Sequence, residues 1–95
     1  MPAYMIAHIE VQDLELFERY REAVVPILTQ HGGRYLVRGG AVLALEGEPE
    51  SDRVVVIEFP TIEAAQAFHA SAEYQPVLAM RLGSATSTVI VVPGV

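Results

Sequence analysis

Two pairs of glycines frame the stretch His31-Gly32-Gly33-Arg34-Tyr35-Leu36-Val37-Arg38-Gly39-Gly40. Glycine adopts the left-handed backbone conformation that ends a helix without steric cost, so the first pair predicts the end of a long helix. The residues between the pairs predict a short strand over residues 34–38, and the second pair predicts a turn or a bulge. Arg38 is therefore expected where a strand meets a flexible corner.

The helix before this stretch is predicted from its N-cap Asp13 to about His31. Apolar side chains recur along it at spacings of three and four, which indicates one buried stripe. Pro26 removes one backbone hydrogen bond and is expected to kink the last turns. The residues of the stripe are Phe17, Tyr20, Val24, Ile27, Leu28 and His31.

Further strands are indicated by alternating or β-branched residues. Residues 53–59 are the least ambiguous of them and are expected at the centre of a sheet, buried on both faces. A second helix is predicted over residues 62–70, and Ser71 is expected to cap a shorter third helix. The remaining strands are predicted over residues 4–11 and 86–92, and residues 41–46 either continue the strand 34–38 or pair again.

The order of these elements predicts an α+β, ferredoxin-like fold, βαββαβ, with a four-stranded antiparallel sheet and helices on one face. We expect the strands 4–11 and 53–59 to be parallel neighbours at the centre of the sheet. The helix-free face would be apolar, and the sheet of a second subunit is its natural cover, so we expect a homodimer packed sheet to sheet. The apolar residues expected on that face are Ile6, Val54, Val56 and Ile90.

Composition bounds the class of protein. The chain has 95 residues, no cysteine, a net charge of −6 and 52% hydrophobic residues, which predicts one globular domain over residues 1–95 without disulfides or thiolate chemistry. Because the chain is acidic and its arginines are scattered singly, we expect no binding to nucleic acid and none to a membrane. No signal peptide or membrane-spanning run is visible, so we expect a cytoplasmic protein.

Motifs spread over almost the whole chain occur at residues 3–7, 31–40, 45–47, 53–60 and 71–75, together with the single residues Tyr20, Pro26 and Arg81. Together they resemble the uncharacterised DUF1330 family. Ala72 stands where the usual pattern has proline, which loses a rigid first helical turn. The resemblance implies a dimeric α/β barrel, in which two ferredoxin-like sheets pack into a shared barrel. The superfamily includes cofactor-independent monooxygenases, isomerases and haem enzymes, so the resemblance implies no single function.

Glu58 is the most informative polar residue, because it interrupts an otherwise apolar strand. A buried carboxylate needs a partner, which His8, Arg38 or Arg34 is expected to supply. His8 is expected close to Glu58 if their strands are neighbours. Such a pair is either an acid/base pair in a pocket or a structural ion pair that ties strands or subunits together.

Four further residues can bind a ligand or pack in the core. Arg38 can hold a carboxylate or an enolate through its planar fork, or it can fix Glu58. Tyr20 lies on the inner stripe of the first helix, and its hydroxyl needs a partner if it is buried. Tyr74 and Arg81 are seven residues apart on one helix face, where they line a cleft or pack.

Two hypotheses follow for the function. The first is a dimer that binds a small carbonyl or aromatic molecule in a pocket lined by Tyr20, Arg38, Glu58 and His8; if catalytic, it would transfer protons or oxidise its substrate without a cofactor. The alternative is a non-catalytic structural or interaction protein whose buried polar residues only stabilise the dimer. We predict no metal site and no cofactor, because the three histidines are widely spaced and His69 alone is weak support for haem.

Overall fold

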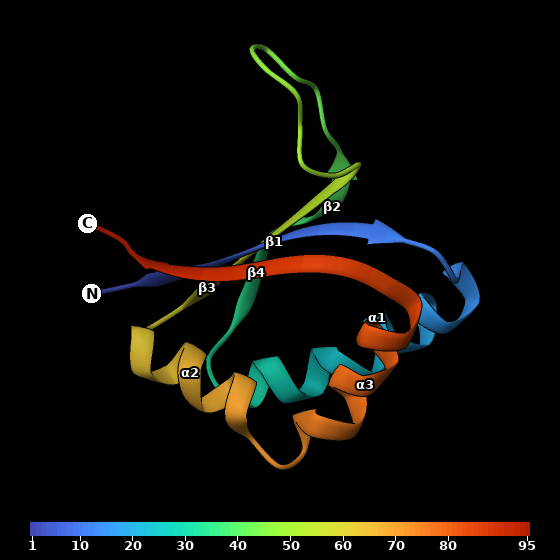
Figure 1. Ribbon diagram of the computed structural model, residues 1–95. Coiled ribbons are helices and arrows are strands. Elements are labelled where there is room, and N and C mark those ends of the chain that lie inside the picture. The colour runs from blue at the N-terminus through green and yellow to red at the C-terminus, as the bar shows by residue number, and fades with distance from the viewer.

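A four-stranded antiparallel sheet carries three helices on one face in the computed structural model, which describes residues 1–95 (Figure 1). This arrangement confirms the predicted ferredoxin-like fold. No helix is both long enough and apolar enough to cross a membrane. In chain order the elements are β1 (Ala3–Val11), α1 (Leu14–Gln30), β2 (Arg34–Ala41), β3 (Arg53–Phe59), α2 (Ile62–Ala70), α3 (Tyr74–Ser84) and β4 (Ala85–Pro93).

The strand order across the sheet is β2-β3-β1-β4, and β1 runs antiparallel to both of its neighbours. The expectation that β1 and β3 are parallel was wrong. A helix returns the chain so that β2 runs in the direction of β1, and the connection from β2 to β3 then reverses the chain, so β3 must run against β1.

Side chains alternate strictly between the two faces of β1. Met5, Ala7 and Ile9 are buried beneath the helices, whereas Ile6 and His8 on the other face are only half-buried. We call this helix-free side of the sheet the open face. Its apolar members include the four predicted, since Ile6 pairs with Val56 on β3 and with Ile90 on β4, and Val54 pairs with His8.

The core lies between the sheet and the helices. Phe59 of β3 and Phe68 of α2 are almost completely buried, and their ring centroids are 5.5 Å apart. β3 is central as predicted. Within the single chain Ile57 and Phe59 are buried beneath the helices, whereas Val54 and Val56 on the open face are half-buried.

The helix ends follow the capping residues, with one exception. Asp13 caps α1 as predicted, because its carboxylate accepts a hydrogen bond from the backbone N–H of Leu16 at 3.1 Å. Ser71 was expected to cap α3, but it ends α2 instead. Its backbone N–H and its hydroxyl both donate to the carbonyl of Phe68. α3 begins three residues later, at Tyr74.

The glycine-framed stretch connects α1 to the edge of the sheet. Gly32 has a φ of +80°, as expected where a helix ends, and a Cβ atom on Gly33 would lie 2.8 Å from Cε1 of Phe59. Gly39 also has a positive φ and sits in a bulge of β2, which confirms the predicted irregularity.

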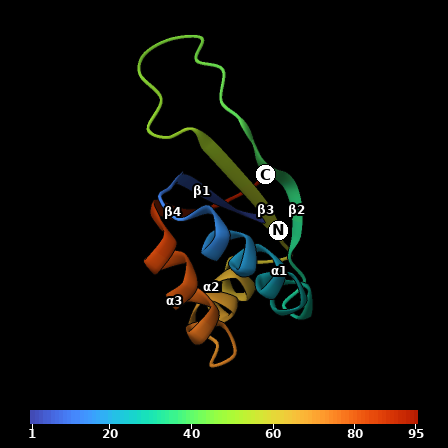
Figure 2. The same ribbon diagram turned by 90° about the vertical axis from the view of Figure 1, so that its right-hand side faces the viewer.

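β2 ends at Ala41, so the expectation that residues 41–46 form a strand was wrong beyond that residue. Ala41 already pairs with Arg53, the first residue of β3, which leaves residues 42–52 without a strand to pair with. These residues extend away from the helices, on the side of the open face (Figures 1 and 2).

We predict that Gly33→Ala lowers the free energy of unfolding by about 1–3 kcal/mol, because the added methyl group overpacks the site against Phe59. Urea unfolding measures the change. Gly40→Ala is the matched control, since nothing lies within 4 Å of a Cβ at that position, and its effect should stay within about 0.5 kcal/mol. Equal stability of the Gly33→Ala variant and the wild type would contradict this account.

Candidate functional site

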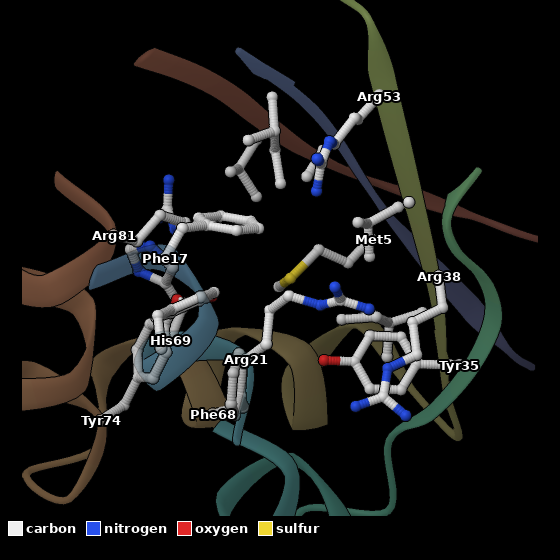
Figure 3. A pocket seen from close by; sticks show the side chains of 17 residues that line it. Met5, Phe17, Arg21, Tyr35, Arg38, Arg53, Phe68, His69, Tyr74 and Arg81 are labelled. Atoms are coloured by element: carbon white, nitrogen blue, oxygen red, sulfur yellow. Dashed lines mark hydrogen bonds between the residues drawn. The ribbon is translucent and has the colours of Figure 1, made fainter. Parts of the chain in front are cut away.

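A pocket opens between the sheet and the helices, on the side opposite the open face (Figure 3). The space within and in front of it, open solvent at the mouth included, is about 690 Å³. Its floor is the apolar centre of the sheet, and its walls carry aromatic rings from all three helices and from β2. The residues that define it are Met5, Ala7, Ile9, Phe17, Tyr20, Arg21, Tyr35, Arg38, Gly39, Arg53, Val55, Ile57, Phe68, His69, Tyr74, Arg81 and Val89.

The space exists because the middle of the floor is small. Ala7 lies on the central strand β1, paired with Val55 of β3 on one side and Val89 of β4 on the other. All three side chains point toward the helices and line the pocket. A methyl group between two isopropyl groups leaves a depression that a larger side chain would fill.

Four of the six basic residues of the chain line this pocket, and no aspartate or glutamate does. We therefore call it the arginine-lined pocket. The arginines come from four different elements: Arg21 from α1, Arg38 from β2, Arg53 from β3 and Arg81 from α3. Figure 3 shows their side chains distributed around the pocket. Positive charge is thus concentrated here in a chain whose net charge is −6.

Three of these arginines have no ion-pair partner. Arg21 is paired with Glu18, with 3.2 Å between Nη1 and Oε1. Arg38 instead lies over the ring of Tyr35, with its guanidinium carbon 4.8 Å from the centroid, and Arg53 lies 5.9 Å from the ring centroid of Phe17. Such cation–π contacts position a guanidinium without neutralising its charge.

Arg81 is the most deeply placed of the four. It is only 5% exposed, donates to the hydroxyl of Ser87 on β4, and lies 5.9 Å from the ring centroid of Tyr20. Taking a guanidinium out of water costs free energy unless an opposite charge compensates it. The partners of Arg81 are neutral, so the pocket contains a buried positive charge that this chain does not neutralise.

The hydroxyl groups of Tyr20 and Tyr74 form a hydrogen bond of 2.9 Å between α1 and α3, which satisfies the expected need of Tyr20 for a partner. Burial raises the pKa of Tyr20 far above its usual value, and Tyr74 raises it further, while Arg81 opposes the shift. Burial also raises the pKa of Tyr35, against the opposing effects of Arg38 and Arg21. Both tyrosines are therefore neutral phenols that serve as hydrogen-bonding groups.

The structure divides the four predicted site residues between the two faces of the sheet. Tyr20 and Arg38 line the arginine-lined pocket, whereas Glu58 and His8 lie on the open face. Arg34 is the one of the three predicted partners that pairs with Glu58. Its Nε donates a hydrogen bond of 2.7 Å to the carboxylate. The expected proximity of His8 to Glu58 was wrong, because the antiparallel register places Tyr4 opposite Glu58.

An extra residue in β2 explains why Arg38 lies on the helix side of the sheet and not on the open face with Arg34. Side chains four residues apart on a regular strand share a face. β2 shifts register between Tyr35 and Val37, so the bulge at Leu36 reverses the alternation. Arg38 consequently pairs across from Val55 and points toward the helices.

Sequence reasoning missed part of the pocket, although signals were available. Arg53 has the same strand parity as Val55 and Ile57, which places it on the helix side. Arg21 follows Phe17 by four residues, which places it on the inner stripe of α1. Tyr74 and Arg81 were predicted to line a cleft or to pack, and both line this pocket.

Metal-ligating side chains do not gather anywhere in the chain: no three His, Cys, Asp or Glu residues come together in an arrangement that could hold a metal ion. His69 lies at the arginine-lined pocket, with its ring centroid 5.7 Å from that of Tyr74. The lining therefore offers one imidazole, three phenol groups and four guanidinium groups as its most distinctive polar chemistry.

The model of the domain of unknown function DUF1330 matches residues 2–95, which is almost the whole chain. The chain belongs to the DUF1330 family. No protein of curated function matches its sequence.

Solved structures share the fold of this DUF1330 protein. A protein of unknown function from Rhodopseudomonas palustris, RPA0582, is 19% identical with a TM-score of 0.81, over 99% of this chain and 82% of that one. SnoaB, a cofactor-independent oxygenase from Streptomyces nogalater, is 13% identical with a TM-score of 0.72, over 98% and 92%. A dimeric ferredoxin-like protein of unknown function from Jannaschia sp. CCS1 is 16% identical with a TM-score of 0.67, over 99% and 100%. At these identities the likeness shows the fold alone.

We predict that the stability of the protein falls as the pH rises above 10, the ordinary pKa of tyrosine. The unfolded chain then releases protons that the folded chain retains on Tyr20 and Tyr35, because burial raises their folded pKa values. Tyr20→Phe should lose less stability than the wild type between about pH 8 and about pH 11. Urea unfolding at the two pH values measures this. The same alkaline loss in both proteins would contradict the assignment.

Proposed function

We propose that this DUF1330 protein is a homodimer that binds a small aromatic or carbonyl compound in the arginine-lined pocket. The observation that carries the binding proposal is the pocket itself: an apolar floor, aromatic walls and a few polar groups that converge on one space. Binding sites for small molecules have this composition. The likeness to the oxygenase SnoaB is compatible with such a site, but the proposal concerns binding.

The size of the pocket limits the ligand. The enclosed part of the pocket is small and its mouth is open, so we propose a compound no larger than a single aromatic ring with one polar substituent. The hydroxyls of Tyr20 and Tyr74 and the guanidinium of Arg38 all line the pocket, and each is a hydrogen-bond donor for an oxygen of such a ligand. If the protein also transfers protons, His69 is the base that the pocket supplies, since burial raises the pKa values of Tyr20 and Tyr35.

We predict that Ala7→Val weakens the binding of single-ring carbonyl compounds, with benzaldehyde as the probe, by about tenfold or more, because the added methyl groups fill the floor. Isothermal titration or ligand-observed NMR measures the affinity. Arg38→Ala should also weaken binding. Glu58→Gln is the control that should leave it unchanged, since Glu58 lies on the other face of the sheet. If single-ring compounds do not bind to the wild type, or bind equally to Ala7→Val, the pocket is not the site.

The open face supports the homodimer part of the proposal. Ile90 remains 46% exposed on it, and Ile6, Val54 and Val56 are only half-buried. The connection 42–52 adds Leu43 and Leu45, which are 83% and 90% exposed. A continuous apolar surface of this kind is characteristic of a protein interface.

A second copy of this chain is the occupant that we propose for the open face. Proteins of the same fold from Jannaschia sp. CCS1 and Bacteroides fragilis are described as dimeric. In the proposed dimer the sheets pack face to face, and residues 42–52 of each copy reach over the other. The pair Glu58–Arg34 and the contact of 3.9 Å between His8 and Glu50 would then belong to the dimer surface, which is the role that the alternative hypothesis gave to the polar residues.

We predict a dimer at micromolar concentration in light scattering, and a monomer for Ile6→Asp, because an unpaired carboxylate in the sheet-to-sheet contact costs several kcal/mol. Leu82→Asp is the control and should remain dimeric, since Leu82 is exposed on α3 away from the sheet. Circular dichroism checks that both variants are folded. If Ile6→Asp does not fold, Leu43→Ser with Leu45→Ser tests the same interface from the connection 42–52, and this double variant should weaken the dimer. A monomeric wild type would overturn the dimer.

A further inference from the structure

We infer that the ligand of the arginine-lined pocket is an anion, a single-ring aromatic carboxylate, and that Arg81 receives its charge. This inference rests on the binding proposed above and adds the chemical class of the ligand. It follows from three observations: the distribution of charge around the pocket, the burial of Arg81 without an ion-pair partner, and the apolar character of the remaining lining.

The charge distribution excludes a cation and disfavours a neutral ligand. Acidic residues outnumber basic ones by 12 to 6 in the chain, yet the lining contains four arginines and no carboxylate. Glu18 offsets Arg21, which leaves Arg38, Arg53 and Arg81 uncompensated. Like charges drawn together around a partly desolvated space repel one another, and an anion between them converts that repulsion into attraction.

Arg81 indicates where the anion binds. It is nine-tenths or more buried, and the one side chain with which it hydrogen-bonds is Ser87, a neutral hydroxyl. A guanidinium carries five N–H donors, so donors remain for a ligand after the bond to Ser87. A buried arginine of this kind normally has a carboxylate partner. The partner that the chain does not supply is the group that we assign to the ligand.

The register of the sheet places a second arginine, Arg53, at the same level of the sheet as Ser87, the partner of Arg81. Ile9 of β1 pairs with Ser87 of β4 on one side and with Arg53 of β3 on the other. Arg81, which is bonded to Ser87, and Arg53 therefore flank Ile9 from both sides. The rings of Phe17 and Tyr20, whose centroids are 5.7 Å apart, lie near these two guanidinium groups. This end of the pocket thus combines positive charge with aromatic surface.

The remaining lining favours an aromatic ring over a bare inorganic anion. Met5, Ala7, Val55, Ile57 and Val89 form an apolar floor that offers no hydrogen bonds from side chains. A phosphate ion would need polar contacts on all sides, whereas a flat ring is complementary to this floor and to the aromatic walls. A carboxylate is the anionic group whose planar geometry matches a guanidinium.

The test compares benzoate with benzamide, a neutral molecule of nearly the same shape, and with inorganic phosphate, by isothermal titration to the full-length protein. We expect benzoate to bind at least about tenfold more tightly than benzamide, as hydrogen bonds to a charged group require. Phosphate should bind more weakly than benzoate. Equal affinity for benzoate and benzamide would overturn the anion assignment and leave the proposed binding function standing, whereas binding of neither would overturn both. Phosphate that binds as tightly as benzoate would overturn the aromatic part.

Variants locate the charge. Arg81→Met should lower the affinity for benzoate by about tenfold or more while affinity for benzamide is retained, because it removes the charge and keeps the volume. A merely structural arginine would affect both ligands alike. If Arg81→Met does not fold, Arg53→Gln tests the same end of the pocket and should weaken benzoate selectively. Arg19→Gln is the control: Arg19 is exposed and paired with Glu15 outside the pocket. Unchanged affinity for benzoate in Arg81→Met, or in its replacement Arg53→Gln, would overturn the assignment.

Discussion

The pairing of β2 with β3 is the constraint on which both surfaces of the protein depend. Side chains of a strand alternate between faces, so one extra residue transfers every later side chain to the other face. The bulge at Leu36 does this in β2. Before the bulge, Arg34 lies on the open face with Glu58; after it, Arg38 lies on the helix side with Val55. Two arginines of the same stretch therefore belong to different surfaces.

The elements of the fold were readable because local chemistry determines them. Asp13 is followed by a helical stripe, Gly32 ends that helix with a positive φ, and the alternation in residues 4–11 matches β1. Period-two reasoning also gave the apolar membership of the open face. The prediction of strand direction was wrong, because direction is set by the connections between strands: β1 and β3 run antiparallel. The capping preference of serine likewise assigned Ser71 to the wrong helix end, because that role depends on how the chain leaves α2.

The candidate site was only half predictable, because a bulge and a register are not local patterns. Tyr20 and Arg38 were named, and they do line one pocket. Glu58 and His8 were grouped with them because Arg38 was one of the partners considered for Glu58, but the bulge places Arg38 on the helix side. Arg53 could have been placed from its parity with Val55. The meeting of arginines from four separate elements is a tertiary property that no single stretch of sequence encodes.

The same irregularity has a consequence for how chains of this kind avoid aggregation. β2 is an edge strand, and an edge strand offers unpaired backbone groups to any further strand. A chain that tried to extend the sheet there would meet two register shifts, a glycine with a φ of +78° at Gly39, and the charged side chain of Arg34. Bulges and charges of this kind interrupt a regular ladder of hydrogen bonds. The distortion that sends Arg38 into the pocket thus also closes the edge of the sheet to fibril-like growth.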